Sequence, residues 1–204
     1  MKESENEMNF FKISNFKSPY SFGYICGIFL ERGSLGKRSI SIRIKNKKLS
    51  EILIKHLENL EVKRIKKIEN ESFTLIKAKF DKKLIVEEIK KSIKNEYLKS
   101  SEEFIRGFLR GYFDIKGYVI IKEEKIEKMV RKRVMIRVAS VSLENLQSIK
   151  NLLLTQGVSS NISRAGKVFI LEIKGKTRVL IFLKNIGFSL EEKSKIIEDS
   201  LIVV

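Results

Sequence analysis

Two segments in which apolar and polar residues alternate carry the side chains best suited to chemistry. Residues 39–45 carry Ile40, Ile42 and Ile44, and residues 131–139 carry Val134, Ile136 and Val138. This spacing of two predicts strands that are buried on one face. Their opposite faces carry Ser39, Ser41, Arg43, Lys45, Arg131, Arg133 and Arg137. Arginine can read guanine in a major groove and any cation can neutralise a phosphate, so this set predicts contact with nucleic acid. The alternative is that these charges only coat a solvated face.

Two further segments contain candidate nucleic-acid contacts. Residues 63–67 are strongly basic, but the pattern leaves open which of their side chains share a face with the set above; the cations there are Lys63, Arg64, Lys66 and Lys67. The corresponding stretch of the second half, residues 159–164, is less charged, and its Ser159, Asn161 and Ser163 are candidates for reading bases.

The chain's single histidine and single cysteine exclude several kinds of site. With only His56, histidine-dependent nuclease chemistry, Ser-His-Asp catalysis and zinc peptidase motifs are disfavoured. With only Cys26, an internal disulfide framework and a cysteine-rich metal cluster are excluded. We therefore expect no metal site and no cofactor.

The charge of the chain favours a polyanionic partner. Its 204 residues contain 42 Lys and Arg against 25 Asp and Glu, a formal net charge of +17. Nucleic acid is the first expectation and an anionic membrane surface the second, although genome composition or a hot habitat would also enrich lysine. The polar start is unlike a signal peptide, and the uncharged run 18–30 is too short to span a bilayer. We expect a cytoplasmic, nucleoid-associated protein without a membrane partner.

Glycine placement shows an internal repeat. Two triplets have the same internal spacings and lie 84 residues apart; they are Gly23, Gly27 and Gly33, and Gly107, Gly111 and Gly117. A glycine inside a helix costs about 1 kcal/mol relative to alanine, so the pattern needs a packing reason. Gly23/Gly27 and Gly107/Gly111 lie one turn apart and predict two small helix faces that pack almost in contact. The last glycine of each triplet is expected to form a left-handed cap, and Ser100 with Glu103 a capping box.

The order of elements also repeats. Each half predicts helix, two strands, helix, two strands and helix, and a final helix closes the chain near residues 190–201. We divide the chain into an N-terminal extension (1–17), a first repeat (18–99) and a second repeat (100–204). The fold class is α+β, a single-chain pseudo-dimer, and because it supplies both halves itself we expect a monomer.

The two motifs resemble those of the LAGLIDADG homing endonucleases. The matching segments are ICGIFLERG (25–33) and LRGYFDIKG (109–117), and the wider FIRGFLRGYFDIKGYV (104–119) is the closer match. The resemblance covers residues from about 18 to 202. It implies two αββαββα repeats, a central helix pair and two antiparallel four-stranded sheets that form a saddle along the DNA major groove.

The resemblance also implies a catalytic centre that this chain lacks. In active members the residue before each final glycine is an acid, and the two acids hold divalent cations. Here Arg32 and Lys116 occupy those positions, and cations at helix C-termini are favoured by the helix dipole and suited to phosphate contact. We therefore predict a duplex-DNA-binding protein that has lost cleavage. The alternatives are an active Mg-dependent endonuclease that uses Glu31 and Asp114, an RNA-binding intron maturase whose partner is structured RNA, and a structural module.

Overall fold

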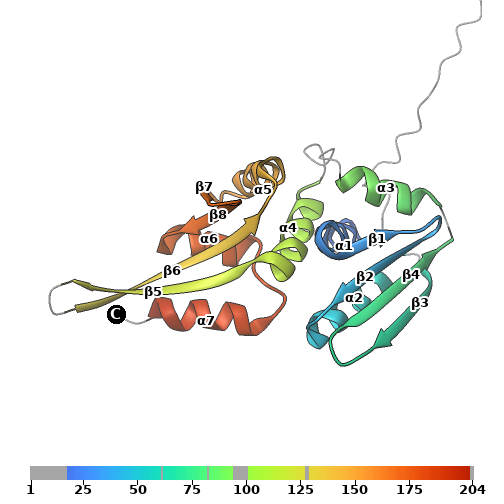
Figure 1. The fold of residues 1–204 in the computed structure, drawn as a ribbon, viewed down its shortest axis with the longest axis horizontal. Coiled ribbons are helices and arrows are strands. Elements are labelled where there is room, and N and C mark those ends of the chain that lie inside the picture. Colours follow the sequence, from blue (N-terminus) through green and yellow to red (C-terminus); the bar gives the residue numbers. More distant parts are fainter. Residues whose placement is uncertain (1–17, 61, 82, 94–100, 127–128, 203–204) are drawn as a thin grey trace, which may run out of the picture.

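The computed structural model describes residues 18–60, 62–81, 83–93, 101–126 and 129–202 (Figure 1). The predicted extension 1–17 and most of the seam between the repeats lie outside these residues. The elements of the first half are α1 (Pro19–Arg32), β1 (Gly33–Leu35), β2 (Ser39–Ile44), α2 (Lys47–Glu58), β3 (Val62–Glu69), β4 (Thr74–Phe80) and α3 (Lys83–Ile93). Those of the second half are α4 (Glu102–Lys116), β5 (Tyr118–Ile126), β6 (Met129–Ser140), α5 (Leu143–Thr155), β7 (Asn161–Ala165), β8 (Val168–Lys174), α6 (Lys176–Asn185) and α7 (Glu191–Ile202). The predicted order αββαββα is confirmed in both halves.

Each half builds one antiparallel sheet of four strands with the same topology. The strand orders are β1-β2-β4-β3 and β5-β6-β8-β7, so the second and fourth strands of each half lie at the centre. The two sheets lie on opposite sides of the α1/α4 helix pair, and the long β5–β6 hairpin extends beyond the other strands of its sheet (Figure 1). The fold is therefore two copies of one unit joined by a helix pair, as predicted.

One face of each sheet is buried under helices and forms the core. In β2 the side chains of Ile40, Ile42 and Ile44 are each 1% exposed, in agreement with the predicted alternation. The aromatic side chains of the helix pair, such as Phe22 and Phe108, belong to the same continuous core. We call the other face of each sheet, opposite this core, its open face.

The helix pair packs with backbone against backbone at its four glycines. A Cβ atom built on Gly27 would lie 2.1 Å from the Phe108 carbonyl oxygen, and one on Gly23 would lie 2.2 Å from that of Phe104. From the other side, a Cβ on Gly107 or Gly111 would lie 2.1 or 2.2 Å from a carbonyl oxygen of α1. No side chain fits at these distances, which explains why the sequence tolerates four glycines in two otherwise ordinary helices.

Two details of the helix ends differ from the prediction. Gly33 and Gly117 are extended, with φ of −97° and −72°, so neither is a left-handed cap. Glycine is needed there for space, because a Cβ on Gly33 would lie 2.1 Å from the Phe29 ring. The cap of α4 is Ser101, one residue later than predicted, and its hydroxyl accepts a hydrogen bond from the Phe104 N–H. Ser100 lies outside the described residues.

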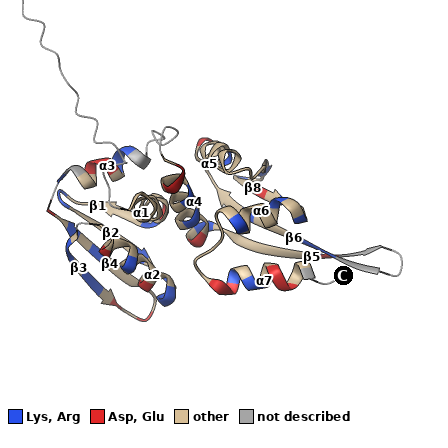
Figure 2. Cartoon of the chain, turned by 180° about the vertical axis from the view of Figure 1, so that it is seen from behind, with Lys and Arg blue, Asp and Glu red and all other residues tan. Residues whose placement is uncertain are grey.

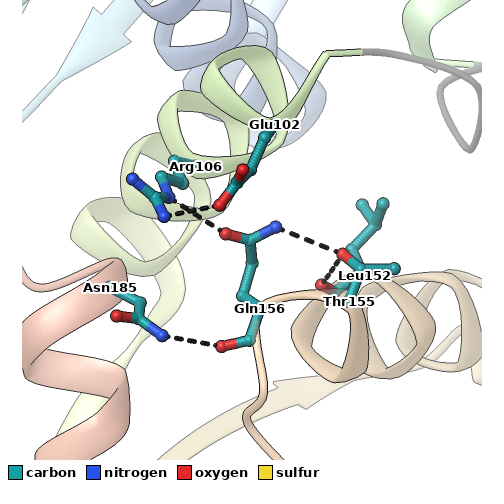
Figure 3. A network of polar contacts seen from close by, with 6 residues as sticks. All are labelled: Glu102, Arg106, Leu152, Thr155, Gln156 and Asn185. Atoms are coloured by element: carbon teal, nitrogen blue, oxygen red, sulfur yellow. Dashed lines mark hydrogen bonds and ion pairs between the residues drawn. The ribbon is translucent and has the colours of Figure 1, made fainter.

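A polar network joins α4 to the ends of α5 and α6 (Figure 3). The Arg106 Nε donates to Gln156 Oε1 at 3.1 Å, and the Asn185 side chain donates to the Gln156 carbonyl at 2.9 Å. Gln156 caps the C-terminus of α5 and Asn185 is the last residue of α6, so Gln156 connects Arg106 of α4 to the ends of both helices. In the first half, Ser21 connects α1 to the end of α2. Its hydroxyl is hydrogen-bonded to His56 of α2 and to Asn59, which caps that helix.

We expect Gly27→Ala to destabilise the protein by more than about 3 kcal/mol, because the added methyl group must push two helix backbones apart. Chemical denaturation followed by circular dichroism measures this. Gly36→Ala is the matched control, since the one contact of its Cβ that is shorter than ordinary van der Waals distance is with the movable hydroxyl of Ser39, at 2.5 Å. Equal stability of the two variants would contradict the close packing of α1 and α4.

Candidate nucleic-acid interface

The charged strand residues on the open face of the first sheet are all cations. On β2 the side chains of Ser39, Ser41 and Arg43 alternate with the buried isoleucines, and strand pairing places Lys79, Lys77 and Leu75 of β4 directly opposite them. On β3 the residues in register with this face are Arg64, Lys66 and Ile68. The strand residues of the face therefore include five cations and no Asp or Glu; the cations are Arg43, Arg64, Lys66, Lys77 and Lys79. Lys45 is exposed just beyond the end of β2.

Two of these cations were not among the predicted contacts, and two others were left undecided by the sequence. Lys77 and Lys79 are exposed between the buried Ile76, Ala78 and Phe80 of β4, an alternation that was already visible in the sequence. A bulge between Val62 and Arg64 sets the phase of β3. It places Arg64 and Lys66 on the open face, whereas Lys63 pairs with Asp81 at 3.2 Å and Lys67 with Glu69 at 2.7 Å.

The open face of the second sheet is mixed. On β6 it carries Arg133, the buried Met135 and Arg137, and on β8 Ile170, Glu172 and Lys174. Arg137 forms an ion pair with Glu172 directly across the strand pair. Asn161 and Ser163 of β7 lie on the same face, as do Tyr118, Ile120 and Lys122 of β5, which pair with Arg137, Met135 and Arg133. The predicted contact Arg131 lies in β6, but its side chain is not among those described. Figure 2 shows the charged segments on both halves.

The two motif helices end beside each other in an ion pair. Lys116 of α4 places its Nζ 3.0 Å from a carboxylate oxygen of Glu31 on α1, with the side chains 29% and 17% exposed. Arg32, at the last position of α1, is exposed. A divalent cation at this place would meet two positive charges and a carboxylate that is already neutralised. Two unit charges about 4 Å apart at an effective dielectric constant of about 20 repel each other by roughly 4 kcal/mol, and the repulsion doubles when one of them is divalent.

Asp114, the other acid of the second motif, is buried and fully engaged. The Tyr24 hydroxyl donates to one of its oxygens at 2.7 Å and the Ser189 backbone N–H to the other at 2.9 Å. Burial raises the pKa of Asp114, and the bonds from Ser189 and Tyr24 act in the opposite direction. Asp114 therefore links α1, α4 and the start of the last helix, and the structure does not bring it together with Glu31 as a pair of free carboxylates.

The C-terminus of α4 is capped by a lysine from α7. Lys193 Nζ donates to the carbonyl oxygens of Gly117 at 2.7 Å, Asp114 at 3.0 Å and Phe113 at 3.3 Å. A cation there satisfies the last carbonyls and complements the negative end of the helix dipole. Burial lowers the pKa of Lys193, and Asp114 counteracts this. Sequence reasoning missed this residue, because only the tertiary fold brings α7 to this helix end.

The described residues contain neither a metal-binding cluster nor a helix that could span a membrane. Within them, no cluster of three or more His, Cys, Asp or Glu side chains has the arrangement to hold a metal ion. Among their helices, none is sufficiently long and apolar to cross a membrane.

His56 lies against the helix pair and not on either open face. Its Nδ1 is 3.0 Å from the Ser21 hydroxyl, and its ring centroid is 4.1 Å from that of Tyr24. Burial lowers the pKa of His56 to about 4, and the cation of Arg110 contributes to the shift. The imidazole is therefore neutral at physiological pH and acts as a packing group.

Comparison with known proteins identifies related sequences and folds. A family model described as a LAGLIDADG-like domain matches residues 103–187. A probable translation initiation factor IF-2 of Methanocaldococcus jannaschii is 30% identical over 186 residues, which are 85% of this chain and 14% of that protein. A DNA-directed RNA polymerase subunit of the same organism is 27% identical over 91% of this chain and 21% of its own length. The chain thus spans a small fraction of these curated relatives.

Solved structures agree with the fold over most of the chain. The homing endonuclease I-DmoI, crystallised in complex with DNA and Mn, matches with a TM-score of 0.61 and 17% identity over 83% of this chain and 97% of that one. Full-length DUF199/WhiA from Thermatoga maritima matches with a TM-score of 0.57 and 18% identity over 92% of this chain and 62% of that one. At these identities the likeness establishes the fold alone.

We expect part of the stability to depend on His56 and to be lost in acid. Because its pKa is lowered in the folded state, from 6.5 to about 4, its stabilising contribution is complete above pH 6.5 and declines as the pH falls toward 4. The loss is about 1–2 kcal/mol, allowing for solvent screening of the half-buried ring. Denaturation of the wild type and of His56→Gln at several pH values measures it. If the free energy of unfolding depended on pH in the same way in both proteins, His56 would not be the source of the acid sensitivity.

Proposed function

The chain carries a LAGLIDADG-like domain in its second half and the LAGLIDADG fold across both halves, and from this premise we propose that it binds duplex DNA site-specifically without cleaving it. The observation that carries the proposal is the open face of the first sheet, where five cations stand among the strand residues without a carboxylate. Five phosphate contacts would make binding strongly salt-dependent.

Duplex DNA fits this surface better than duplex RNA. The B-form major groove admits two neighbouring β-strands, whereas the A-form major groove of RNA is too narrow and deep for side chains to read. The two open sheets on either side of one helix pair suit a ligand with two successive half-sites (Figure 1). I-DmoI, which has this fold, was crystallised with DNA.

The ends of the motif helices support binding without cleavage. Arg32 and Lys116 stand where the family's metal-holding acids would be, and Lys116 neutralises the nearby Glu31. Asp114 is committed to Tyr24 and Ser189. With these carboxylates engaged and two cations in place, the centre is suited to contact a phosphate and not to hold a divalent metal.

The names of the curated relatives do not support a role in translation or transcription for this chain. One is a translation factor and another an RNA polymerase subunit, yet this chain matches 14% of the first and 21% of the second. A segment shared by two proteins with different activities is best explained as a separate module within each. This chain matches too little of either protein to take an activity from their names, and its proposed role follows from its own surface.

Selection from a random duplex DNA library, with and without Mg²⁺ or Mn²⁺, tests the proposal directly. Both retained molecules and newly broken ends are sequenced. A retained consensus without metal-dependent ends is the expected result. Metal-dependent broken ends would contradict the loss of cleavage, and failure to retain DNA even at low salt would contradict DNA binding itself.

We expect the double variant Arg32→Asp, Lys116→Glu to bind Mn²⁺ that the wild type does not bind, because it restores an acid before each final glycine. The measurement is the shift of the thermal unfolding midpoint with Mn²⁺, since a ligand that binds the folded state raises it. The control is Lys37→Glu, Arg38→Asp, which makes the same change of charge on the exposed β1–β2 turn. A metal-dependent shift in the wild type, equal to that of the variant, would contradict the prediction.

A further inference from the structure

Four polar side chains form one row across the open face of the second sheet. Strand pairing places Tyr118 opposite Arg137, Arg137 opposite Glu172, and Glu172 opposite Asn161. Tyr118 and Asn161 are exposed, and Arg137 and Glu172 are half-buried between them. The row therefore presents a hydroxyl, a guanidinium, a carboxylate and an amide, and its formal charge is zero.

The first sheet has an equivalent row of different chemistry. Each row begins at the residue directly after the last glycine of its motif, Ser34 or Tyr118. In the first sheet Ser34 lies opposite Ser41, Ser41 opposite Lys77, and Lys77 opposite Lys66. Lys77 thus occupies the position that Glu172 has in the second sheet. The row of the first sheet therefore contains two cations, Lys66 and Lys77, whereas the row of the second sheet contains the ion pair of Arg137 with Glu172.

Glu172 fixes the orientation of the Arg137 guanidinium. The Nε of Arg137 donates to Glu172 Oε2, and its Nη2 forms an ion pair with the same oxygen. The Nη2 also lies 4.0 Å from the sulfur of Met135, which is buried on this face. These contacts use Nε and Nη2 on one edge of the planar group, and none of the described contacts uses Nη1.

A carboxylate at this place is unfavourable for simple phosphate binding. It adds a negative charge to a surface that would lie against a polyanion, and it cancels the charge of the arginine beside it. The arrangement is instead suited to base recognition, because an arginine that is already oriented loses less conformational freedom when it forms two hydrogen bonds to guanine O6 and N7.

We propose that Glu172 is a positioning residue that holds Arg137 to read one guanine in the half-site under the second sheet, while the equivalent Lys77 neutralises a phosphate in the other half-site. This inference rests on the proposed function. The two sheets would then have different roles. The neutral row of the second sheet would discriminate between bases, and the row of the first sheet with two cations would supply salt-dependent affinity.

The test compares Glu172→Gln with Lys77→Gln, two substitutions at equivalent positions, by duplex selection and by binding at several salt concentrations. Arg137→Ala should reduce the preference for guanine at one position roughly 5- to 100-fold. Glu172→Gln should weaken that preference at the same position and leave the salt dependence undiminished. Lys77→Gln should leave the consensus unchanged and lower the slope of log affinity against log salt by about 0.9.

Controls separate a positioning role from a structural one. Thermal unfolding of each variant reports whether the sheet is intact, and Arg137→Lys should fail to restore the guanine preference because lysine lacks the planar fork. The inference is overturned if Glu172→Gln raises affinity equally for all sequences with an unchanged consensus, since Glu172 would then be only a repulsive charge. It is also overturned if the variant loses a cytosine preference, because Glu172 would then contact a base itself.

Different results would contradict DNA binding and the roles of Arg137 and Glu172. If the wild type retains no duplex at low salt, the proposed function fails and takes this inference with it. If the wild type retains a consensus and Arg137→Ala leaves that consensus unchanged, only the division of work between the halves is wrong.

Discussion

The contact on which the structure depends is the backbone packing of α1 against α4. Four glycines allow the two helices to approach until a Cβ atom on any of them would lie 2.1 or 2.2 Å from a carbonyl oxygen of the other helix. Because each sheet begins directly after one of these helices, the helix pair sets the positions of both sheets. It also brings the ends of the two motifs together, so that Glu31 of one helix reaches Lys116 of the other at 3.0 Å.

The chemistry at these helix ends agrees with their electrostatics. A helix C-terminus carries a partial negative charge and favours cations, and here it receives them at three positions: Arg32, Lys116 and the capping Lys193. The acids nearby are neutralised by Lys116 or buried under hydrogen bonds, as Asp114 is. The catalytic arrangement that the motif resemblance implies needs two acids at this place, against the helix dipole. Our proposal of binding without cleavage is consistent with the removal of that electrostatic strain.

The two halves share a topology but not a surface. Their cores follow the same alternation of isoleucine, valine and leucine, since both sheets must be covered by helices in the same manner. Their open faces are free of that constraint. One carries five cations and no carboxylate among its strand residues, whereas the other carries cations together with Glu172, which pairs with Arg137. A duplicated fold can therefore present different chemistry to the two halves of one ligand, which a symmetric homodimer cannot do.

The sequence by itself determined the repeat, the order of elements, the buried faces of the strands and the glycine helix pair, because these depend on local periodicity and on spacing along the chain. It also located Arg32 and Lys116 at the ends of the two motifs. Only the tertiary structure decided which charges act together. The phase of β3 depends on a bulge, the engagement of Asp114 on Tyr24 and Ser189, and the partner of Arg137 on the register with β8. Each joins residues far apart in the chain, and pairing at that distance is set by packing, which local sequence patterns do not specify.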